Sequence, residues 1–458
     1  MEHRGWNARV ELRPPQVFVL LVLCLVLIPR GAASASASAE VALPDFASSD
    51  RTASVAFDLR EFLLELHYSQ AMRRLYGIDY KVLTLYEDPP LEKPESLLGL
   101  ASGLTPRQVV ALKFFHLGEA LTEDEANELF RADDAGLRKG LERLKLVVEV
   151  APRRWALNDL SLIGYELLGG SQLFLLLDLP ARYRRDGGRA TAAISSLSNM
   201  FLHRLELLAK RQNYRVGGIV ADFGCGSGIQ ALALLLLYPD IQLAYGLEID
   251  AHSINLANFN AVLNGVAERF ETIDNGDPAN LEAALAGRKI DFAVSNPPFN
   301  IVPPSLSRHL SGFGNGGPTG LDITAIFVAQ AAKTLAPGGQ FLFFSQLAVD
   351  STGRLLVGEL FEGTDLSPVF EPAELYSLSY PPERMPDYAK QLLALAARHG
   401  ASELPTWREI VKELTAAQVN EIQLGFVVAG RPALGPFQSY PTKFPVRFEP
   451  FQPRYGAP

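Results

Sequence analysis

The sequence predicts an α/β fold in which an open, mostly parallel sheet follows a mostly helical N-terminal domain. An apolar run with β-branched residues ends in a glycine cluster at residues 224–228. Strand-like and helix-like apolar segments alternate after this cluster, and helical periodicity dominates before residue 180. The chain has 458 residues, 48% of them hydrophobic, which suits two or three domains with a large core.

The first predicted strand covers residues 218–223 and leads directly into Gly224-Cys225-Gly226-Ser227-Gly228. A fully buried parallel strand has this mostly apolar composition. Glycines can adopt positive φ and let the backbone approach a ligand closely. Residues 229–237 are apolar at almost every position and predict a helix packed on the sheet, which Tyr238-Pro239-Asp240 ends.

The second predicted strand covers residues 242–247 and places Glu248 at its C-terminal end. An acid about 20 residues after such glycines suits a ribose diol, and open α/β sheets bind ligands at the carboxyl ends of their strands. The alternative is a glycine loop that serves only as a tight turn. A dinucleotide site is disfavoured, because residues 224–228 lack the G-x-G-x-x-G spacing and no second dinucleotide half follows.

The fourth predicted strand, residues 290–295, runs into a polar and proline-rich tetrapeptide. Its members are Asn296, Pro297, Pro298 and Phe299. The prolines fix the backbone and bring no amide donors, so the Asn296 amide oxygen and a backbone carbonyl can both accept hydrogen bonds from one NH2 group. Phe299 offers a flat face to a planar group. The alternative is a proline-rich strand end with a buried phenylalanine.

Further segments complete the predicted sheet and its helices. The expected strands are residues 270–273, 340–344, 374–380 and 422–428, the last two as a final antiparallel pair. The expected helices are residues 253–263, 323–335 and most of 387–417, with an interruption near Pro405. Residues 337–339 predict a turn, and residues 301–320 are a candidate lid.

The segment from Asp222 to Gly228, Glu248 and the tetrapeptide resemble the class I S-adenosylmethionine-dependent methyltransferases of the N-P-P-[YF] type. This resemblance implies a Rossmann-like, seven-stranded sheet. It also implies methyl transfer to a planar amide or exocyclic amino nitrogen. Residues 316–322 resemble the D-G-G-x-D-G-L segment of release-factor glutamine methyltransferases, but Phe299, Asn315 and Thr319 replace the Tyr and the two Asp residues of that family.

The resemblance also implies a role for each site residue. The cofactor S-adenosylmethionine would contact Asp222, Gly224, Gly226, Gly228, Glu248, Asp277 and Asn296. In this scheme the glycine loop holds the methionine part, Glu248 the ribose and Asp277 the adenine amino group. Asn296 and the Pro297 carbonyl orient the acceptor nitrogen, and Phe299 stacks on the substrate.

The implied acceptor is a protein glutamine side chain or an RNA or DNA base, in a partner related to the ribosome or translation. Two alternatives stay open. One is methylation of a small secondary metabolite, and the other is a non-catalytic module that binds the cofactor and recruits a partner.

Residues 41–180 predict a helical, winged-helix-like domain before a catalytic domain at 181–458 with a C-terminal extension. A helix is expected at 55–72, and three more begin at Thr105-Pro106, at the capping box of residues 122–125 and at Asp133-Asp134. A hairpin follows at 147–157, with Arg153 and Arg154 at its tip. Contact with nucleic-acid phosphate is one interpretation. A substrate-positioning or dimerising domain is favoured, since acids offset the bases.

The net charge of −9 argues against a general grip on long nucleic acid, although basic residues gather between Arg182 and Arg215. This region either meets an RNA or acidic protein or is a solvated linker and helix face. Residues 165–179 are largely apolar and are expected to pack between the domains. Cys24 and Cys225 make no disulfide framework, and no metal site is expected. Cys225 is interpreted as a small loop residue.

Residues 1–40 have the layout of a secretory signal, with an apolar run at 17–28 followed by small residues. The run is short for a membrane span. One interpretation is a targeting leader or membrane tether. The other interpretation is that the start of translation is misassigned and that the true first residue lies near Val41. This interpretation agrees with the expected cytoplasmic location.

Overall fold

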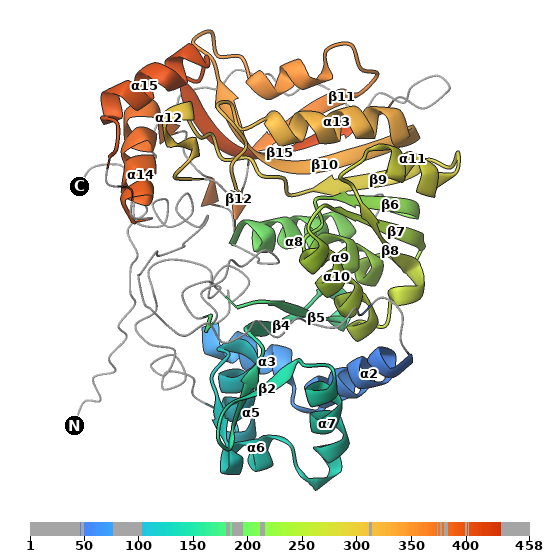
Figure 1. The fold of residues 1–458 in the computed structure, drawn as a ribbon. Coiled ribbons are helices and arrows are strands. Elements are labelled where there is room, and N and C mark those ends of the chain that lie inside the picture. The colour runs from blue at the N-terminus through green and yellow to red at the C-terminus, as the bar shows by residue number, and fades with distance from the viewer. Residues whose placement is uncertain are drawn as a thin grey trace, which may run out of the picture.

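A computed structural model of the chain describes residues 46, 50–76, 103–179, 184–185, 196–210, 216–310, 314–372, 374–375, 378–379, 383–398, 401 and 403–431. A helical N-terminal unit and a large sheet lie at opposite ends, and the strands β4 (Leu160–Glu166) and β5 (Gln172–Asp178) lie between them (Figure 1). Within these described residues, no helix is both long enough and apolar enough to span a membrane. The expected leader, and the tail after residue 431, lie outside them.

Seven of the eight strands of the large sheet follow the order β11-β15-β10-β9-β6-β7-β8. Their bounds are β6 (Gly218–Phe223), β7 (Ile241–Glu248), β8 (Phe270–Asp274), β9 (Ile290–Ser295), β10 (Leu335–Val349), β11 (Ser367–Pro372) and β15 (Glu421–Gly430). Strands β6 to β10 pair in parallel, whereas β15 pairs antiparallel with both β10 and β11. The short β14 (Glu383–Arg384) pairs with the start of β15. The predicted seven-stranded α/β sheet is confirmed.

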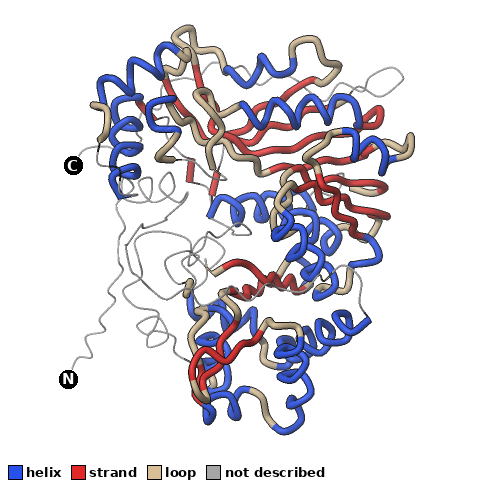
Figure 2. The backbone as a smooth tube through the Cα atoms, in the orientation of Figure 1, coloured by secondary structure: helices blue, strands red, loops and turns tan. Residues whose placement is uncertain are grey.

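Helices cover both faces of this sheet (Figures 1 and 2). One face carries α8 (Ser196–Ala209), α9 (Ile229–Leu237) and α10 (Ala251–Leu263). The other carries α11 (Ala279–Leu285) and α13 (Asp322–Thr334), and the cluster of buried residues there includes α14 (Met385–Arg398) and α15 (Trp407–Ala416). Successive strand residues such as Val220 and Ala221 belong to opposite faces, as the two-residue period of a strand requires.

The edge of the sheet differs from the prediction. Strand β15 lies where residues 422–428 predict a strand, but its outer partner is β11 and not residues 374–380. Residues Glu374–Leu375 (β12) and Leu378–Ser379 (β13) pair with each other instead. Strand β11 was not predicted, because it contains Pro368 and Pro372. An edge strand tolerates proline, since only one of its sides must form hydrogen bonds with a neighbouring strand. The turn predicted at 337–339 is an irregularity within β10.

The N-terminal unit combines short helices with a three-stranded sheet, and its assignment as a winged helix stays a prediction. Its elements are α5 (Pro106–Ala111), η1 (Leu112–His116), β1 (Leu121–Thr122), α6 (Glu123–Leu129), η2 (Ala132–Asp134), α7 (Ala135–Arg143), β2 (Val147–Ala151) and β3 (Arg154–Leu157). The three strands form one sheet in the order β1-β3-β2. Thr122 caps α6 through the expected capping box, and Thr105 caps α5 before Pro106, as expected. Gln108 completes a capping box at Thr105 that was not predicted.

One predicted helix is two helices. Residues 55–72 were expected to be continuous, but α2 (Asp50–Glu65) ends before His67 and α3 (Tyr68–Tyr76) begins after it. His67 has a φ of 50°, in the left-handed region that interrupts an α-helix. The apolar face expected on this segment is buried all the same.

The short elements of the catalytic half are η5 (Ala267–Arg269), α12 (Pro304–Ser307) and η6 (Leu356–Phe361).

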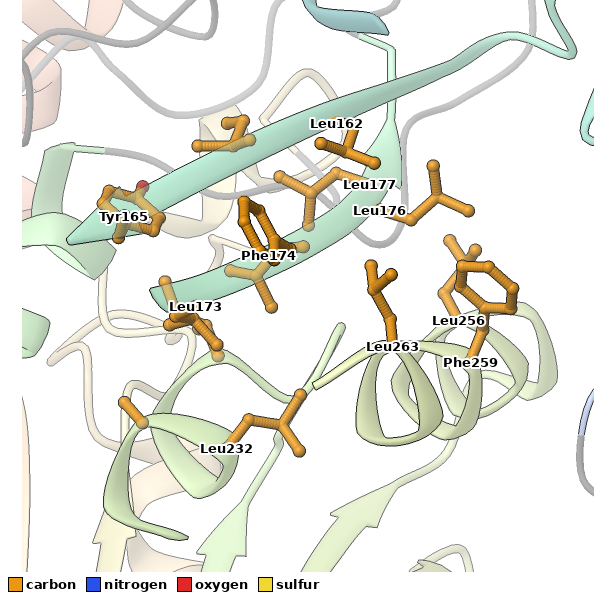
Figure 3. Close-up of a cluster of buried hydrophobic side chains, with 14 of the residues drawn as sticks. Leu162, Tyr165, Leu173, Phe174, Leu176, Leu177, Leu232, Leu256, Phe259 and Leu263 are labelled. Atoms are coloured by element: carbon orange, nitrogen blue, oxygen red, sulfur yellow. The ribbon is translucent and has the colours of Figure 1, made fainter. Parts of the chain in front are cut away.

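The β4–β5 hairpin packs as its apolar sequence predicts. Its turn contains η3 (Leu168–Gly170). Phe174 and Leu176 of β5 face Leu232 of α9 and Phe259 and Leu263 of α10 (Figure 3). One continuous hydrophobic cluster therefore joins the N-terminal unit to this face of the sheet.

Candidate active site

Three segments that are distant in the sequence meet at the carboxyl edge of the sheet. Phe223, the last residue of β6, is in register with Leu247 of β7 and with Ser295 of β9. The residues that follow these three positions are therefore neighbours along the edge. They are Gly224 with its loop, Glu248 and Asn296. The chain leaves β6 toward β7 on one side and returns to β9 on the other, which makes this edge the topological switch point.

The glycine loop has the backbone that its composition predicts. Gly224, Gly226 and Gly228 have φ values of 71°, 54° and 88°. The amides of Gly224 and Cys225 donate to the Leu247 carbonyl over 2.8 and 2.9 Å and tie the loop to β7. A Cβ at Gly226 would meet no atom within 4 Å, so the backbone there borders open space that a ligand can enter.

Glu248 anchors this loop through its carboxylate. Oε2 accepts from the Gly226 amide over 2.9 Å, and Oε1 accepts from the amides of Ile249 and Asp250 over 2.8 and 3.1 Å. A carboxylate offers roughly four acceptor positions. Three of these acceptor positions are in use, so Glu248 can accept about one more hydrogen bond. To bind both hydroxyls of a diol, Glu248 would have to give up one of its backbone hydrogen bonds.

Asp222 lies fully buried beneath the loop. Its Oδ2 accepts from the Ala231 amide at the start of α9 over 3.1 Å, and its Oδ1 has no hydrogen-bond partner. Burial, together with repulsion from Glu248, raises the pKa of Asp222 to about 8. A buried carboxyl oxygen without a partner suits a cationic group such as an ammonium, which agrees with a cofactor that carries an amino acid part.

Asn296 presents the acceptor on which the predicted chemistry depends. Its Nδ2 donates to the Ser198 Oγ of α8 over 3.4 Å, which orients the carboxamide. Its Oδ1 is buried and has no hydrogen-bond partner. The preceding Ser295 Oγ donates to the Phe223 carbonyl over 2.7 Å and joins β9 to β6 directly below the site. An oriented acceptor without a donor suits an N–H group of a ligand.

Phe299 is packed in the core, as the alternative interpretation of the tetrapeptide expects. Its side chain is 4% exposed, and its ring meets Phe344 edge to face with the centroids 5.2 Å apart. Stacking of Phe299 on a substrate stays a prediction.

Asp277 follows β8, the strand next to β7, and the nearby Asn275 amide donates to the Glu248 carbonyl over 2.9 Å. Asp277 is exposed, and its Oδ1 accepts from the Ala279 amide over 2.9 Å. Among the described residues, no hydrogen bond or ion pair joins Asp277 to Asp222, Glu248 or Asn296. Its contact with adenine stays a prediction.

Sequence reasoning missed three features of the site. Ser198 belongs to no motif, and only the fold brings it to Asn296. Ile249 is 69% exposed directly after Glu248, where its apolar side chain is available to a flat ligand. The sequence feature that could have indicated Ile249 is its apolar character directly after Glu248.

The third missed feature is the packing of the late glycines. A Cβ at Gly316 would lie 2.8 Å from the Phe299 Cα, and a Cβ at Gly320 would lie 2.5 Å from the Phe299 carbonyl oxygen. Asn300 exchanges backbone hydrogen bonds of 2.9 Å with Gly314 and Gly316. This part of the candidate lid packs on the tetrapeptide, and the glycines permit that close approach. The opening and closing of the segment stays a prediction.

Cys225 matches its interpretation as a small loop residue. Cys225 is buried, which raises the pKa of its thiol, so it is a poor nucleophile. The described arginines of the basic region do not form a solvated face, because the side chains of Arg184 and Arg204 are only 9% and 14% exposed. Arg184, Arg185 and Arg204, from the basic region, form ion pairs with Asp178, Asp159 and Glu371. Arg182, Arg189, Arg211 and Arg215 lie outside the described residues. Within the residues that are described, no cluster of three potential metal ligands occurs.

Comparisons with known proteins agree with this geometry. Residues 198–362 match the family model of the methyltransferase small domain. A ribosomal protein L11 methyltransferase of Actinobacillus succinogenes is 32% identical over 31% of this chain and 46% of its own length. A release factor glutamine methyltransferase of Bradyrhizobium diazoefficiens is 35% identical over 27% of this chain and 42% of its own length. A ribosomal RNA small subunit methyltransferase C of Shewanella halifaxensis is 28% identical over 38% and 46%.

The chain thus spans less than half the length of each of these three relatives. Among solved structures, the YcgJ protein of Bacillus subtilis is 18% identical and covers 51% of this chain and 99% of its own, with a TM-score of 0.29 that supports no inference. The family model covers the loop, the acid and the tetrapeptide together. Residues 198–362 are therefore similar to the methyltransferase small domain, and all three relatives are methyltransferases.

Proposed function

We propose that this protein is an S-adenosylmethionine-dependent N-methyltransferase whose acceptor is a planar amide or exocyclic amino nitrogen. The observation that carries the proposal is the buried, partnerless Oδ1 of Asn296, which lies at the same sheet edge as the open glycine loop and Glu248. A nitrogen conjugated to a π system has its hydrogens in the plane of the group. In-plane oxygen acceptors can therefore select and orient it.

In the proposed mechanism the chain positions the nitrogen and stabilises the charge that grows on it. When bound, S-adenosylmethionine supplies an electrophilic methyl group. Asn296 Oδ1 and the Pro297 carbonyl accept the two hydrogens of the acceptor NH2 group and direct its lone pair along the line of transfer. Both oxygens would face the acceptor nitrogen and stabilise the positive charge that grows on it during transfer. A proton leaves the nitrogen afterwards, so no strong base is required.

We further propose that the acceptor is macromolecular: a protein glutamine side chain or a nucleic-acid base of the translation apparatus. The support is the names of the relatives, which act on a ribosomal protein, a release factor and ribosomal RNA. The winged helix predicted for the N-terminal unit also suits a domain that presents a large substrate.

The first prediction concerns Asn296→Ala. This change removes the acceptor and leaves the glycine loop and Glu248 in place, so turnover should fall by about 100-fold or more. The dissociation constant for S-adenosylhomocysteine, measured by calorimetry, should change by less than about threefold. Asn127→Ala, at an exposed position of α6, is the control and should behave as wild type.

Cofactor labelled in its methyl group, incubated with cell lysate and the purified protein, provides the turnover assay and identifies the acceptor. Label in the protein or RNA fraction that disappears with Asn296→Ala supports the proposal. Label in small molecules alone supports the metabolite alternative. Cofactor binding without transfer to any fraction supports the binding module. Equal losses of binding and turnover in Asn296→Ala would contradict the role of the carboxamide.

A further inference from the structure

Two asparagines of α10 hold strand β5 as a neighbouring strand would. Asn264 Oδ1 accepts from the Phe174 amide over 2.9 Å, and its Nδ2 donates to the Phe174 carbonyl over 2.6 Å. Asn260 makes the same pair of bonds to Leu176, over 2.7 and 2.9 Å. Four helical residues rise roughly 6 Å and two strand residues roughly 7 Å, so the two carboxamides match alternate residues of the strand.

Asn260 makes one contact that Asn264 does not. Its Nδ2 also donates to the Ser227 carbonyl over 3.0 Å. Ser227 lies within the glycine loop, between Gly226, whose backbone borders open space, and Gly228. Asn260 is 0% exposed, and both of its amide hydrogens are in use. One buried side chain therefore connects β5, α10 and the candidate cofactor loop.

Apolar packing supports the same connection. Leu162, Phe174 and Leu176 of the hairpin lie over Leu256 and Phe259 of α10 (Figure 3). A Cβ at Gly228 would touch Ala257 of the same helix at 3.5 Å, so loop and helix are in close contact. The hairpin thus packs against the helix that contacts the loop. The Asn260 carboxamide, which joins hairpin and loop, is fully buried.

We infer that the β4–β5 hairpin is a structural part of the cofactor site, and that Asn260 is the positioning residue through which it holds the glycine loop. The inference rests on the proposed function, because it assigns the loop to the cofactor. It goes beyond that function in making cofactor affinity depend on a segment outside residues 198–362, the part that matches the family model. The hairpin, which lies between the N-terminal unit and the sheet, then contributes to cofactor binding without touching the cofactor.

The test compares Asn260→Asp with Asn264→Asp in the full chain. Both changes replace a carboxamide by a carboxyl group one helical turn apart, but only the first removes the donor to the Ser227 carbonyl. Calorimetry with S-adenosylhomocysteine should give about tenfold or greater weakening for Asn260→Asp and less than about threefold for Asn264→Asp. Equal weakening by the two variants, or none by either, would overturn the inference.

Hydrogen exchange supplies a readout that does not depend on cofactor binding. In Asn260→Asp, the amides of residues 224–231 and of β5 should exchange faster than in the wild type. In Asn264→Asp, faster exchange should be confined to β5. Faster exchange of β5 alone in both variants would show that the loop does not depend on Asn260.

A wild-type experiment covers the case in which Asn260→Asp does not fold. S-adenosylhomocysteine should slow exchange of the amides of Phe174 and Leu176 as well as those of the loop, because rigidifying the loop also rigidifies the strand joined to it. Protection of the loop without protection of β5 would contradict the inference. A wild-type protein that does not bind S-adenosylhomocysteine at all would instead contradict the proposed function.

Discussion

Two buried oxygen atoms without hydrogen-bond partners mark the candidate site. Asp222 and Asn296 each keep one buried oxygen without a hydrogen-bond partner, and leaving such a group unsatisfied costs about 1–3 kcal/mol. Ser198 holds the other end of the Asn296 carboxamide, so its free oxygen has a defined direction. We expect a ligand to supply the missing donors or cations at these two oxygens.

At the scale of a residue, Asp222 has a testable effect on stability. The pKa of its buried carboxyl is about 8 in the folded chain and has an ordinary value of 3.8. Between these values the folded state binds the extra proton, so the free energy of unfolding should fall as pH rises from 3.8 to about 8. Asp222→Asn removes this group, and its stability should decline less over that range.

Urea unfolding of both proteins at pH values of about 5 and 8 measures this difference. The stability advantage of Asp222→Asn over the wild type should be larger at the higher pH. Parallel losses of stability in the two proteins would show that the Asp222 carboxyl has no raised pKa.

At the scale of an element, the segment from Gly314 to Asp322 depends on how closely it approaches the tetrapeptide. The Asp322 amide donates to the Gly316 carbonyl over 2.9 Å, and the Val302 amide donates to the Gly317 carbonyl over the same distance. These hydrogen bonds hold the segment in its turn and against residues 298–302. Gly320 has a φ of 76° and faces the Phe299 carbonyl, so neither its conformation nor its surroundings suit a side chain.

Gly320→Ala tests this contact against a matched control. Gly353 has a φ of 85°, and a Cβ there would meet no atom within 4 Å. Gly353→Ala should lose roughly 1–2 kcal/mol of stability from its left-handed backbone alone. Gly320→Ala should lose a further 1–3 kcal/mol or so from overpacking and should also lower methyl transfer. Thermal unfolding and the transfer assay measure both effects, and indistinguishable variants would contradict the assigned contact.

Elements that depend on interactions between residues close in sequence were predicted, whereas elements that depend on distant residues were missed. Thr105 and Thr122 cap helices through residues three positions away, and both helix starts were predicted. Strand β11 was missed because its prolines are acceptable only at a sheet edge, which a single segment does not reveal. His67 interrupts a continuous apolar face without changing its period, so the break between α2 and α3 left no signal.

At the scale of the whole molecule, the N-terminal unit and the catalytic sheet share one hydrophobic cluster and a set of polar links. Besides the two asparagines, His252 at the start of α10 bonds to Asp178 at the end of β5, with Nε2 and Oδ1 2.8 Å apart. Arg184 contacts the same Asp178 oxygen over 3.1 Å. The hairpin is thus attached to α10 at both ends of the helix.

The His252 link should make this attachment sensitive to pH. The hydrogen bond to Asp178 raises the pKa of His252, Asp250 acts in the same direction, and burial and Arg184 oppose them. Because the folded-state pKa is raised, the stabilisation is fully present below the ordinary value of 6.5 and is lost as pH rises through the folded pKa.

His252→Gln removes the titrating group and keeps a polar side chain. The melting temperature of the wild type should exceed that of the variant by more at a pH of about 6 than at about 9. Thermal unfolding followed by circular dichroism measures this, and a difference that does not change with pH would exclude the link.

The sequence by itself predicted the segments that make up the candidate site. Strand, glycine loop, acid and tetrapeptide are local patterns, because each depends on the backbone conformation and composition of a few adjacent residues. Only the tertiary structure decided which side chains support them: Ser198 meets Asn296 across 98 residues of chain, and Asn260 meets the Ser227 carbonyl across 33. Such contacts follow from strand order and helix packing, which no single stretch of the chain encodes.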